Sequence, residues 1–420
     1  MSEKIFVATL AKQEEILSEL RGQRPKRYGY RVKMDEPDTS ARVEYIYDAV
    51  GMTPAYMDFA AGSFNYGSWK NVWFVRDNYP CMVKSSGVED YQLDANNYTV
   101  RADDPSANSD VSNTSYDGNA MAAIPLVWVK RWQEDGYQYV SFCETQYDEG
   151  YKAYAHTRPD GSIAAKTYHA MFKGGLVGGK LRSLKDLWPE NGTNAQQELD
   201  YAKANGSEWN IRTWSLHELI ADLLTLISKN MNAQAAFGTG CTTGYVDDAS
   251  QHYGQLKGGS LFSKGQFYGA GPSDTRTQVK VFHIEGFWGE RWDRLAGLIY
   301  ENGVWKAKMT GEGGYNLTGA GYTAVCHGVP HSGTDSFWGW QKEVKQTEFG
   351  RFPVGELTGG DQSYEADYHW VNNHITAVCL AGADCDAGSG CGPRVLNANN
   401  VAGAAWWGFG ASLSLVGPSL

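Results

Sequence analysis

The sequence has no long apolar run. Its longest apolar stretch, Leu219 to Ile227, is interrupted by Asp222 and is far shorter than the roughly 18 residues that a membrane-spanning helix needs. We therefore expect no insertion into a membrane. The first residues also lack the basic region, apolar core and cleavage site of a secretory signal, so we expect the chain to be made in a cytoplasm.

Basic residues and cysteines are scarce. Lys and Arg number 37 against 48 Asp and Glu, a net charge of −11, and such a chain repels phosphate backbones unless its bases gather on one face. We therefore expect no nucleic-acid partner. The seven cysteines are an odd number without a CxxC pair. Neither a disulfide framework nor a zinc ribbon is indicated, and reduced thiols are expected.

Glycine and tryptophan are abundant instead. The chain has 49 glycines, 13 prolines and 15 tryptophans, which predicts long, ordered loops held by large aromatic side chains. Charged residues make up 20% and aromatic residues 13%, a balance that excludes a disordered chain. A length of 420 residues predicts two or three domains.

The stretch from Ala102 to Ala120 marks the expected domain boundary, because it has almost no large apolar side chain and many turn-forming residues. We expect an N-terminal attachment or oligomerisation domain over residues 1–105, a linker over 106–120 and a second domain over 121–420. The first domain should be mostly β with a leading helix.

The leading helix carries heptad-like spacing of Phe6, Leu10, Leu17 and Leu20. This spacing fits a short oligomerisation or docking helix, and it also fits an amphipathic helix that packs on its own domain. The second interpretation is favoured because helices this short are marginal alone.

The remaining patterns predict an α+β protein with Gly-rich loops. One strong helix is expected from Ser215 to Lys229, where Ser215 and Glu218 match a capping box and an apolar stripe follows. Strands are expected at Val43 to Val50, Val72 to Val75, Val279 to Ile284 and Leu295 to Tyr300, and a hairpin is expected to join Ile124 to Trp132 with Tyr137 to Cys143.

Two motifs come close to binding signatures and depart from them. The run GGLVGGK from Gly174 to Lys180 has the spacing of a P-loop, but Leu181 stands where Ser or Thr should hold magnesium, so we favour a glycine-rich turn. His327 and His331 are four apart, yet proline and glycine between them prevent the helix that would align them. We expect no metal and no cofactor.

The segment EGFWGERWD supports a hydrolase hypothesis. Glu285, Glu290 and Asp293 could act as acid and base beside tryptophan platforms for a sugar. The alternative is that Trp288 and Trp292 pack in the core while the acids pair with neighbouring arginines. We favour the alternative, because charged loops of this kind are usually satisfied surfaces.

The end of the chain has an unusual composition. Residues 366–420 contain no Lys, Glu, Gln or Met, although all four are frequent earlier. Asn, Asp, His, Tyr, Ser, Cys, Ala, Val and Gly stand instead between tryptophans and glycines. Drift in a Gly/Ala-rich region is one explanation, and a specific family supplies another.

Several segments resemble the variable proteins of gut-phage tails that diversity-generating retroelements diversify. These segments are WSLHELIADLLTLI, VKVFHIEGFWGERWDRLAG, YNLTGAGY and the ending from LTGGDQSYEADYHW to WWGFGASLSL. The resemblance covers residues 119–420 and implies a C-terminal C-type lectin fold of the formylglycine-generating-enzyme-like subclass. The catalytic element of those enzymes is divergent here, at residues 289–294, and the cysteine match is vague, so the resemblance favours binding without enzymatic activity.

The resemblance also implies which positions vary. Adenine mutagenesis of AAY codons never yields Lys, Glu, Gln, Met or Trp, which fits the absence of Lys, Glu, Gln and Met from residues 366–420. The resemblance places the diversified region at about 360–412. The expected ligand-binding, variable positions are Tyr368, His369, Asn372, Asn373, Asp384, Asp386, Ala387, Arg394, Asn397 and Asn400. The expected scaffold of the site is Trp370, Trp406 and Trp407. Tyr and Asn supply adaptable contacts of the kind found in antibody loops.

The function implied is that of a receptor-binding protein in the virion tail, synthesised in the host cytoplasm and used in host adsorption. Its partners would be a bacterial surface protein or glycan and other tail proteins, with a homo-oligomer, preferably a trimer, as a further expectation. The alternative is a surface-glycan hydrolase, a depolymerase on the virion.

Overall fold

The computed structural model describes residues 24–34, 36, 41–360 and 367–420. The protein is 12% helical and 36% strand, so it is mostly β, and the expected α+β class is right only in that a few helices accompany the strands. The expected leading helix over the first 20 residues lies outside the described residues. Within them, no helix is long and apolar enough to cross a membrane.

Three sheets form the body of the protein, and the bounds of their strands follow in spatial order. The four-stranded sheet contains β2 (Val43–Tyr47), β1 (Arg27–Lys33), β10 (Tyr137–Cys143) and β9 (Trp128–Glu134). The seven-stranded sheet contains β14 (Asn210–Ile211), β27 (Leu413–Val416), β11 (Lys166–Ala170), β8 (Gly118–Pro125), β5 (Tyr79–Lys84), β6 (Glu89–Asp94) and β7 (Asn97–Arg101). The eight-stranded sheet contains β19 (Thr323–His327), β18 (Val304–Ala307), β17 (Trp292–Glu301), β24 (Thr376–Gly382), β25 (Gly392–Ala398), β23 (Tyr368–Val371) and β20 (Phe337–Trp340), with β26 (Phe409–Gly410) beside β17.

Short elements complete the fold. The two-stranded pairs are β3 (Tyr56–Asp58) with β4 (Ser63–Asn65), β12 (Gly175–Val177) with β13 (Lys180–Arg182), β15 (Lys280–Val281) with β16 (Ile284–Glu285), and β21 (Val344–Thr347) with β22 (Gly350–Pro353). The α-helices are α2 (Trp73–Arg76), α3 (Ala195–Lys203), α4 (Trp214–Ser228) and α5 (Ala233–Phe237). The 3₁₀ helices are η1 (Tyr154–His156), η2 (Ala249–Gly254) and η3 (Gly388–Gly390).

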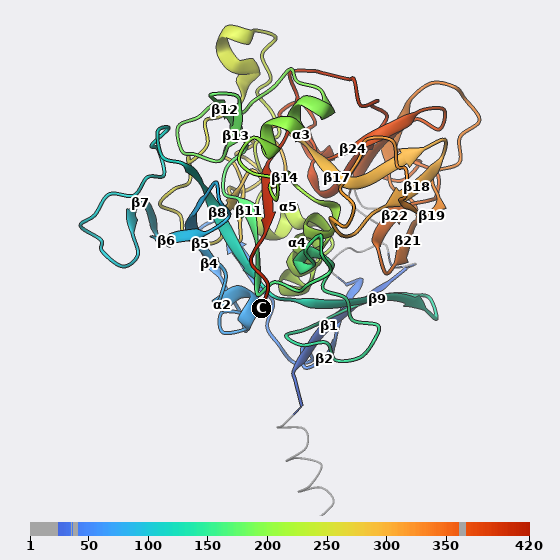
Figure 1. Cartoon of the computed structure of the whole chain (residues 1–420). Helices are drawn as coiled ribbons and strands as arrows, with labels where there is room; N and C mark the ends of the chain where they lie inside the picture. Colours follow the sequence, from blue (N-terminus) through green and yellow to red (C-terminus); the bar gives the residue numbers. More distant parts are fainter. Residues whose placement is uncertain (1–23, 35, 37–40, 361–366) are drawn as a thin grey trace, which may run out of the picture.

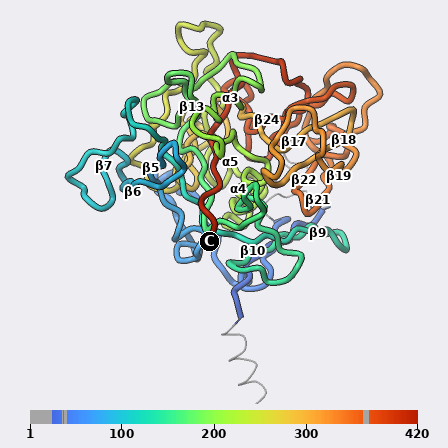
Figure 2. The backbone as a smooth tube through the Cα atoms, viewed as in Figure 1, coloured from blue at the N-terminus to red at the C-terminus, as the bar shows by residue number. Residues whose placement is uncertain are grey.

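Figure 1 shows how these layers lie. Strands β5 to β8 of the seven-stranded sheet occupy one side, β17, β18 and β24 of the eight-stranded sheet occupy the other, and β1, β2 and β9 lie below them. Figure 2 follows the red C-terminal segment to the middle of the molecule, where β27 pairs with β11 and β14. The last strand of the chain, β27, therefore lies in the same sheet as β5 to β8, which come from the first half of the chain.

The predicted domain boundary is wrong. Residues 102–117 do form a mostly exposed loop, between β7 and β8. However, β5 pairs with β8 and β1 pairs with β10, so strands from both sides of the loop share two sheets. A lack of apolar residues indicates exposure, and a long polar loop can connect strands of one sheet as readily as two domains.

Helix α4 lies in the interior of the molecule. Its predicted position is confirmed within a residue at each end, but Thr213, not Ser215, is the N-cap, and its side chain accepts a bond from the Leu216 N–H. The whole helix is buried, not only its apolar stripe. It therefore contacts neighbours on all sides, including those of its polar residues.

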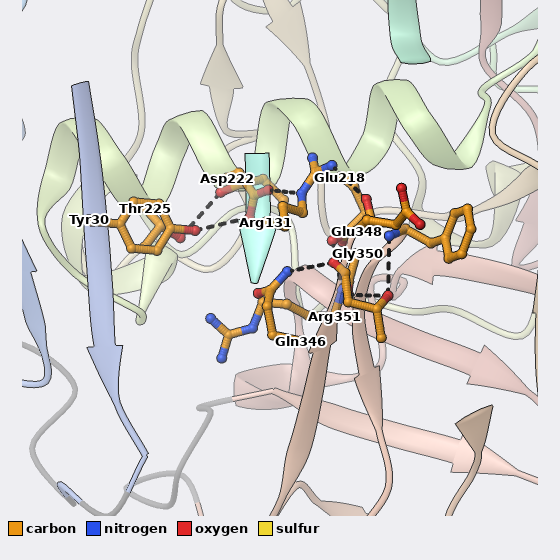
Figure 3. Close-up of polar contacts among 12 residues, drawn as sticks. Tyr30, Arg131, Glu218, Asp222, Thr225, Gln346, Glu348, Gly350 and Arg351 are labelled. Atoms are coloured by element: carbon orange, nitrogen blue, oxygen red, sulfur yellow. Dashed lines mark hydrogen bonds and ion pairs between the residues drawn. The ribbon is translucent and has the colours of Figure 1, made fainter. Parts of the chain in front are cut away.

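Those polar residues accept hydrogen bonds from strands of three sheets, and Figure 3 shows some of these contacts. Asp222 accepts hydrogen bonds from Tyr30 of β1 at 2.9 Å, from Arg131 of β9 at 2.7 Å and from Arg394 of β25 at 2.6 Å. Glu218 accepts from the backbone N–H of Arg351 in β22 at 3.1 Å. The helix thus fastens the four-stranded sheet to the eight-stranded sheet.

Several local predictions can be compared directly. The hairpin of β9 and β10 is confirmed, with Asp135 and Gly136 at positive φ in its turn. The glycine-rich turn is confirmed as the loop between β12 and β13. The strand expected at residues 72–75 is not formed: Val72 is the N-cap of the short helix α2, Trp73–Arg76, because burial among core aromatics overrides the β propensity of these residues. Residues 279–284 are split into β15 and β16 by positive φ at Phe282 and His283.

Candidate functional site: a tryptophan-lined pocket

A pocket of about 460 Å³ opens where β23, β25 and the segment after β25 meet β17. The side chains that line it are aromatic, amide, acidic or small. They are Trp292, Trp370, Asp384, Asp386, Ala387, Asn397, Asn399, Asn400, Ala404, Ala405, Trp406 and Phe409. No basic residue belongs to this described lining, so its charge is negative.

The sheet register places the side chains of one wall. Strand β23 runs parallel to β25, which puts Trp370 beside Asn397, and it runs antiparallel to β20, which puts Trp338 opposite Trp370. Because side chains alternate along a strand, these three share one face of the sheet. The neighbours His369 and Val371 point to the other face and are buried.

The aromatic rings support one another in edge-to-face pairs. The ring centroids of Trp292 and Trp370 are 5.1 Å apart, and those of Trp406 and Phe409 are 5.5 Å apart. Such pairs are favourable beyond the area that they bury. Trp406 remains 46% exposed, so its indole is available to a ligand.

Amides and carboxyls form the polar wall. The Nδ2 atom of Asn400 donates to Oδ1 of Asn397 at 2.8 Å and to Oδ1 of Asn399 at 2.6 Å. Oδ1 of Asp384 accepts from the backbone N–H of Asp386 at 3.0 Å. Burial raises the pKa of Asp384 to about 6, whereas Asp386 is exposed. This wall can both donate and accept hydrogen bonds.

Half of the expected variable positions meet in this pocket. They are Asp384, Asp386, Ala387, Asn397 and Asn400, and the expected scaffold residues Trp370 and Trp406 join them. These residues come from two segments of the chain that the parallel pairing of β23 and β25 holds together.

The other expected positions lie elsewhere. Asn373, in the turn between β23 and β24, accepts a bond from the Tyr300 hydroxyl at 2.6 Å and donates to a backbone carbonyl at 2.9 Å. Asn372, beside it, donates to the Ser336 hydroxyl at 3.4 Å. Tyr368 is half-buried, with its ring 4.6 Å from that of Trp370.

Two expected ligand-binding residues are structural. His369 is 1% exposed and its Nδ1 atom accepts from the backbone N–H of Leu396 at 3.2 Å. Arg394 is 5% exposed and bonds Asp222. Eight of the positions are expected to form one contiguous exposed patch, namely Tyr368, His369, Asn372, Asn373, Asp384, Asp386, Arg394 and Asn397. This expectation is wrong, because strand alternation turns part of the set toward the core.

The two adjacent tryptophans differ. Trp407 is 7% exposed and stacks on Tyr245 and Tyr253, with centroids 4.3 and 5.8 Å away. It has the surroundings of a scaffold residue. Trp406 was also expected to be scaffold, but it is exposed at the pocket and can contact a ligand directly.

Sequence reasoning missed part of the lining. Asn399 lies in the run Asn397 to Asn400, whose amide-rich composition could have indicated it. Phe409 and the small residues Ala404 and Ala405 carry no such signal, because only the fold of the segment after β25 brings them to the pocket.

The three carboxylates of the hydrolase hypothesis lie in the core. Glu285, Glu290 and Asp293 are 2%, 0% and 0% exposed. Asp293 pairs with Lys173 at 2.6 Å and Arg212 at 2.8 Å; against the effect of burial, these cations hold its pKa well below the usual range. The other two accept backbone N–H bonds at 2.9 Å. The favoured alternative is correct in placing Trp288 and Trp292 in the core, where they are 0% and 3% exposed. It is wrong in expecting the acids on a charged surface beside neighbouring arginines, because they are buried and Asp293 pairs with cations from other segments.

No cluster of three or more His, Cys, Asp or Glu that could hold a metal occurs among residues 24–34, 36, 41–360 and 367–420. His327 and His331 are both exposed, and only His327 lies in a strand, β19.

Comparisons with known proteins give distant structural likeness. No protein-family profile matches the chain, and no curated protein matches its sequence. Among solved structures, the chain is similar to "Major Tropism Determinant U1 Variant", with a TM-score of 0.29 and 11% identity over 80% of this chain and 71% of that one. It is also similar to PvdO from Pseudomonas aeruginosa, with a TM-score of 0.29 and 10% identity over 73% of this chain and 97% of that one.

Proposed function

We propose that the protein is a receptor-binding protein of a phage tail, and that the tryptophan-lined pocket is the centre of its ligand-binding surface. The proposal includes a C-type lectin fold for the C-terminal part, diversification by a retroelement, and attachment to other tail proteins through the N-terminal part, preferably as a trimer. It binds a protein or glycan on a bacterial surface and catalyses no reaction.

One observation carries the proposal. Five positions that the resemblance to retroelement-diversified tail proteins implies are variable line one pocket, together with the exposed indole of Trp406. Variable side chains on a paired-strand framework can change a binding site without changing the fold. Many copies on one particle would strengthen a weak individual contact.

The test uses the labelled full chain and a panel of bacterial strains, with cell binding measured by flow cytometry. We expect binding to some strains only, and Trp406→Ala should weaken it about ten-fold or more, because a central exposed aromatic is a typical hot spot. The matched control is Trp188→Ala. Trp188 is 37% exposed, stacks on His252 and lies outside the pocket lining.

Equal loss in both variants, or no loss in either, would contradict the assignment of the pocket. Failure to bind any strain of a panel that includes the natural host of the phage would contradict the receptor-binding function itself. A genomic observation is independent of both: an adjacent reverse-transcriptase gene and a near-copy of the C-terminal coding region, differing at adenines, are expected.

A further inference from the structure

An aromatic row continues beyond the pocket along the outer strands of the eight-stranded sheet. Strand pairing puts Trp338 opposite Trp370 and Trp340 opposite Tyr368, all on the face that carries Asn397. The ring of Tyr368 lies 4.6 Å from Trp370 and 5.4 Å from Trp340. Trp338 is 59% exposed at the edge strand β20.

The size of the pocket favours a small ring over a protein surface. At about 460 Å³ it falls within the range of small-molecule sites, roughly 300–1,000 Å³. A protein partner would instead cover a broad surface, about 800 Å² on each side. A chain of ring-shaped units would fill the pocket and then follow the row.

The side chains of the pocket walls indicate which chemical class of ligand fits. Asn397, Asn399 and Asn400 present linked amides, which match hydroxyl groups because both donate and accept. Indole faces match the C–H faces of sugar rings. Asp384 and Asp386 supply negative charge and no basic residue joins them in the described lining, so an acidic ligand would be repelled.

We infer that the receptor is an oligosaccharide without acidic groups, an inference that rests on the proposed function. The oligosaccharide enters the pocket at Trp406 and runs over Trp370 to Trp338. The pocket holds one end of the oligosaccharide, and the aromatic row holds the following sugars.

The experiment measures binding of the labelled full chain to immobilised oligosaccharides of glucose, galactose, mannose and N-acetylglucosamine, beside matched oligosaccharides that contain uronic acids. We expect binding to members of the first group only. Trp406→Ala should weaken every such interaction about ten-fold, whereas Trp338→Ala should weaken binding of trisaccharides and longer chains by about ten-fold and leave disaccharides within about three-fold. Trp188→Ala is again the control.

Each other outcome has a defined meaning. Preference for uronic-acid oligosaccharides overturns the inference. If no oligosaccharide binds while whole bacteria still bind through Trp406, the receptor is a protein, and the inference falls although the proposed function stands. If the protein binds neither oligosaccharides nor bacteria, both the inference and the proposed function are contradicted.

Discussion

Trp406 and Trp407 are adjacent in the sequence and serve different purposes. Trp407 is enclosed by Tyr245 and Tyr253 and is 7% exposed, whereas Trp406 is 46% exposed at the pocket. The two residues begin a turn in which the Phe409 N–H donates to the Trp406 carbonyl at 3.2 Å, and their ring centroids are 4.8 Å apart. The inner ring can therefore stabilise the site while the outer ring contacts a ligand.

At this scale we expect Trp407→Ala to destabilise the protein by about 3–5 kcal/mol, because it leaves a cavity in a packed cluster. Trp406→Ala and Asn400→Ala should each change the free energy of unfolding by about 1 kcal/mol or less. Chemical denaturation measures all three. Similar losses at Trp406 and Trp407 would show that both rings are structural.

Helix α4 combines burial with charge. Its residues Glu218 and Asp222 are 2% and 0% exposed and respond differently to their surroundings. Burial raises the pKa of Glu218 to about 7. Against the effect of burial, Arg131 and Arg394 lower the pKa of Asp222. Asp222 is therefore the ionised acid that joins the sheets, and Glu218 titrates near neutral pH.

This difference predicts a pH effect on stability. Because the pKa of Glu218 is higher in the folded protein than its ordinary value of 4.5, its contribution is fully present below pH 4.5 and is lost as the pH rises through 7. In Glu218→Gln this loss disappears, so its stability relative to wild type should increase by about 1–3 kcal/mol between pH 5 and pH 8.

The stability of the variant must be compared with that of wild type at each pH, because both contain buried histidines with a lowered pKa. These histidines make stability increase with pH, opposite to the effect of Glu218. They are His156, His169, His217, His283 and His369. Asp222→Asn tests the ionised member of the pair: it should lose about 3–5 kcal/mol, because it removes the charge that Arg131 and Arg394 bind. A constant difference between Glu218→Gln and wild type over this range would refute the titration.

The whole molecule is held together across its polar loop. The loop at 102–117 separates β7 from β8, yet β5 pairs with β8, and β1 pairs with β10. The buried bond from the Tyr30 hydroxyl to Asp222 adds a further connection. A cut in the exposed loop would leave all of these contacts in place.

We therefore expect that a specific protease site placed at residues 112–115 is cleaved readily, while the two fragments remain associated. They should elute as one peak from a native sizing column and appear as two bands on a denaturing gel. The uncleaved insertion variant is the control for folding. Two separate native peaks would support independent domains and contradict the shared sheets.

Sequence reasoning succeeded where the signal is local. The helix at 214–228, the hairpin of β9 and β10 and the glycine turn between β12 and β13 depend on periodicity and on residues that favour particular backbone angles. The exposure of residues 102–117 was also predictable, because they lack apolar side chains.

Only the tertiary structure decided which strands pair and which faces are exposed. Pairing of β1 with β10 and of β5 with β8 joins distant segments, and no local pattern specifies such partners. The same pairing determines which residues line the pocket. His369 and Trp370 are adjacent, and no local pattern shows which of the two is exposed. The register of β23 buries His369 and presents Trp370 to the pocket. Composition could show that residues 366–420 differ from the rest of the chain. Which of their side chains reach the pocket is decided by the sheet, because strand alternation specifies a face only once the buried side is set.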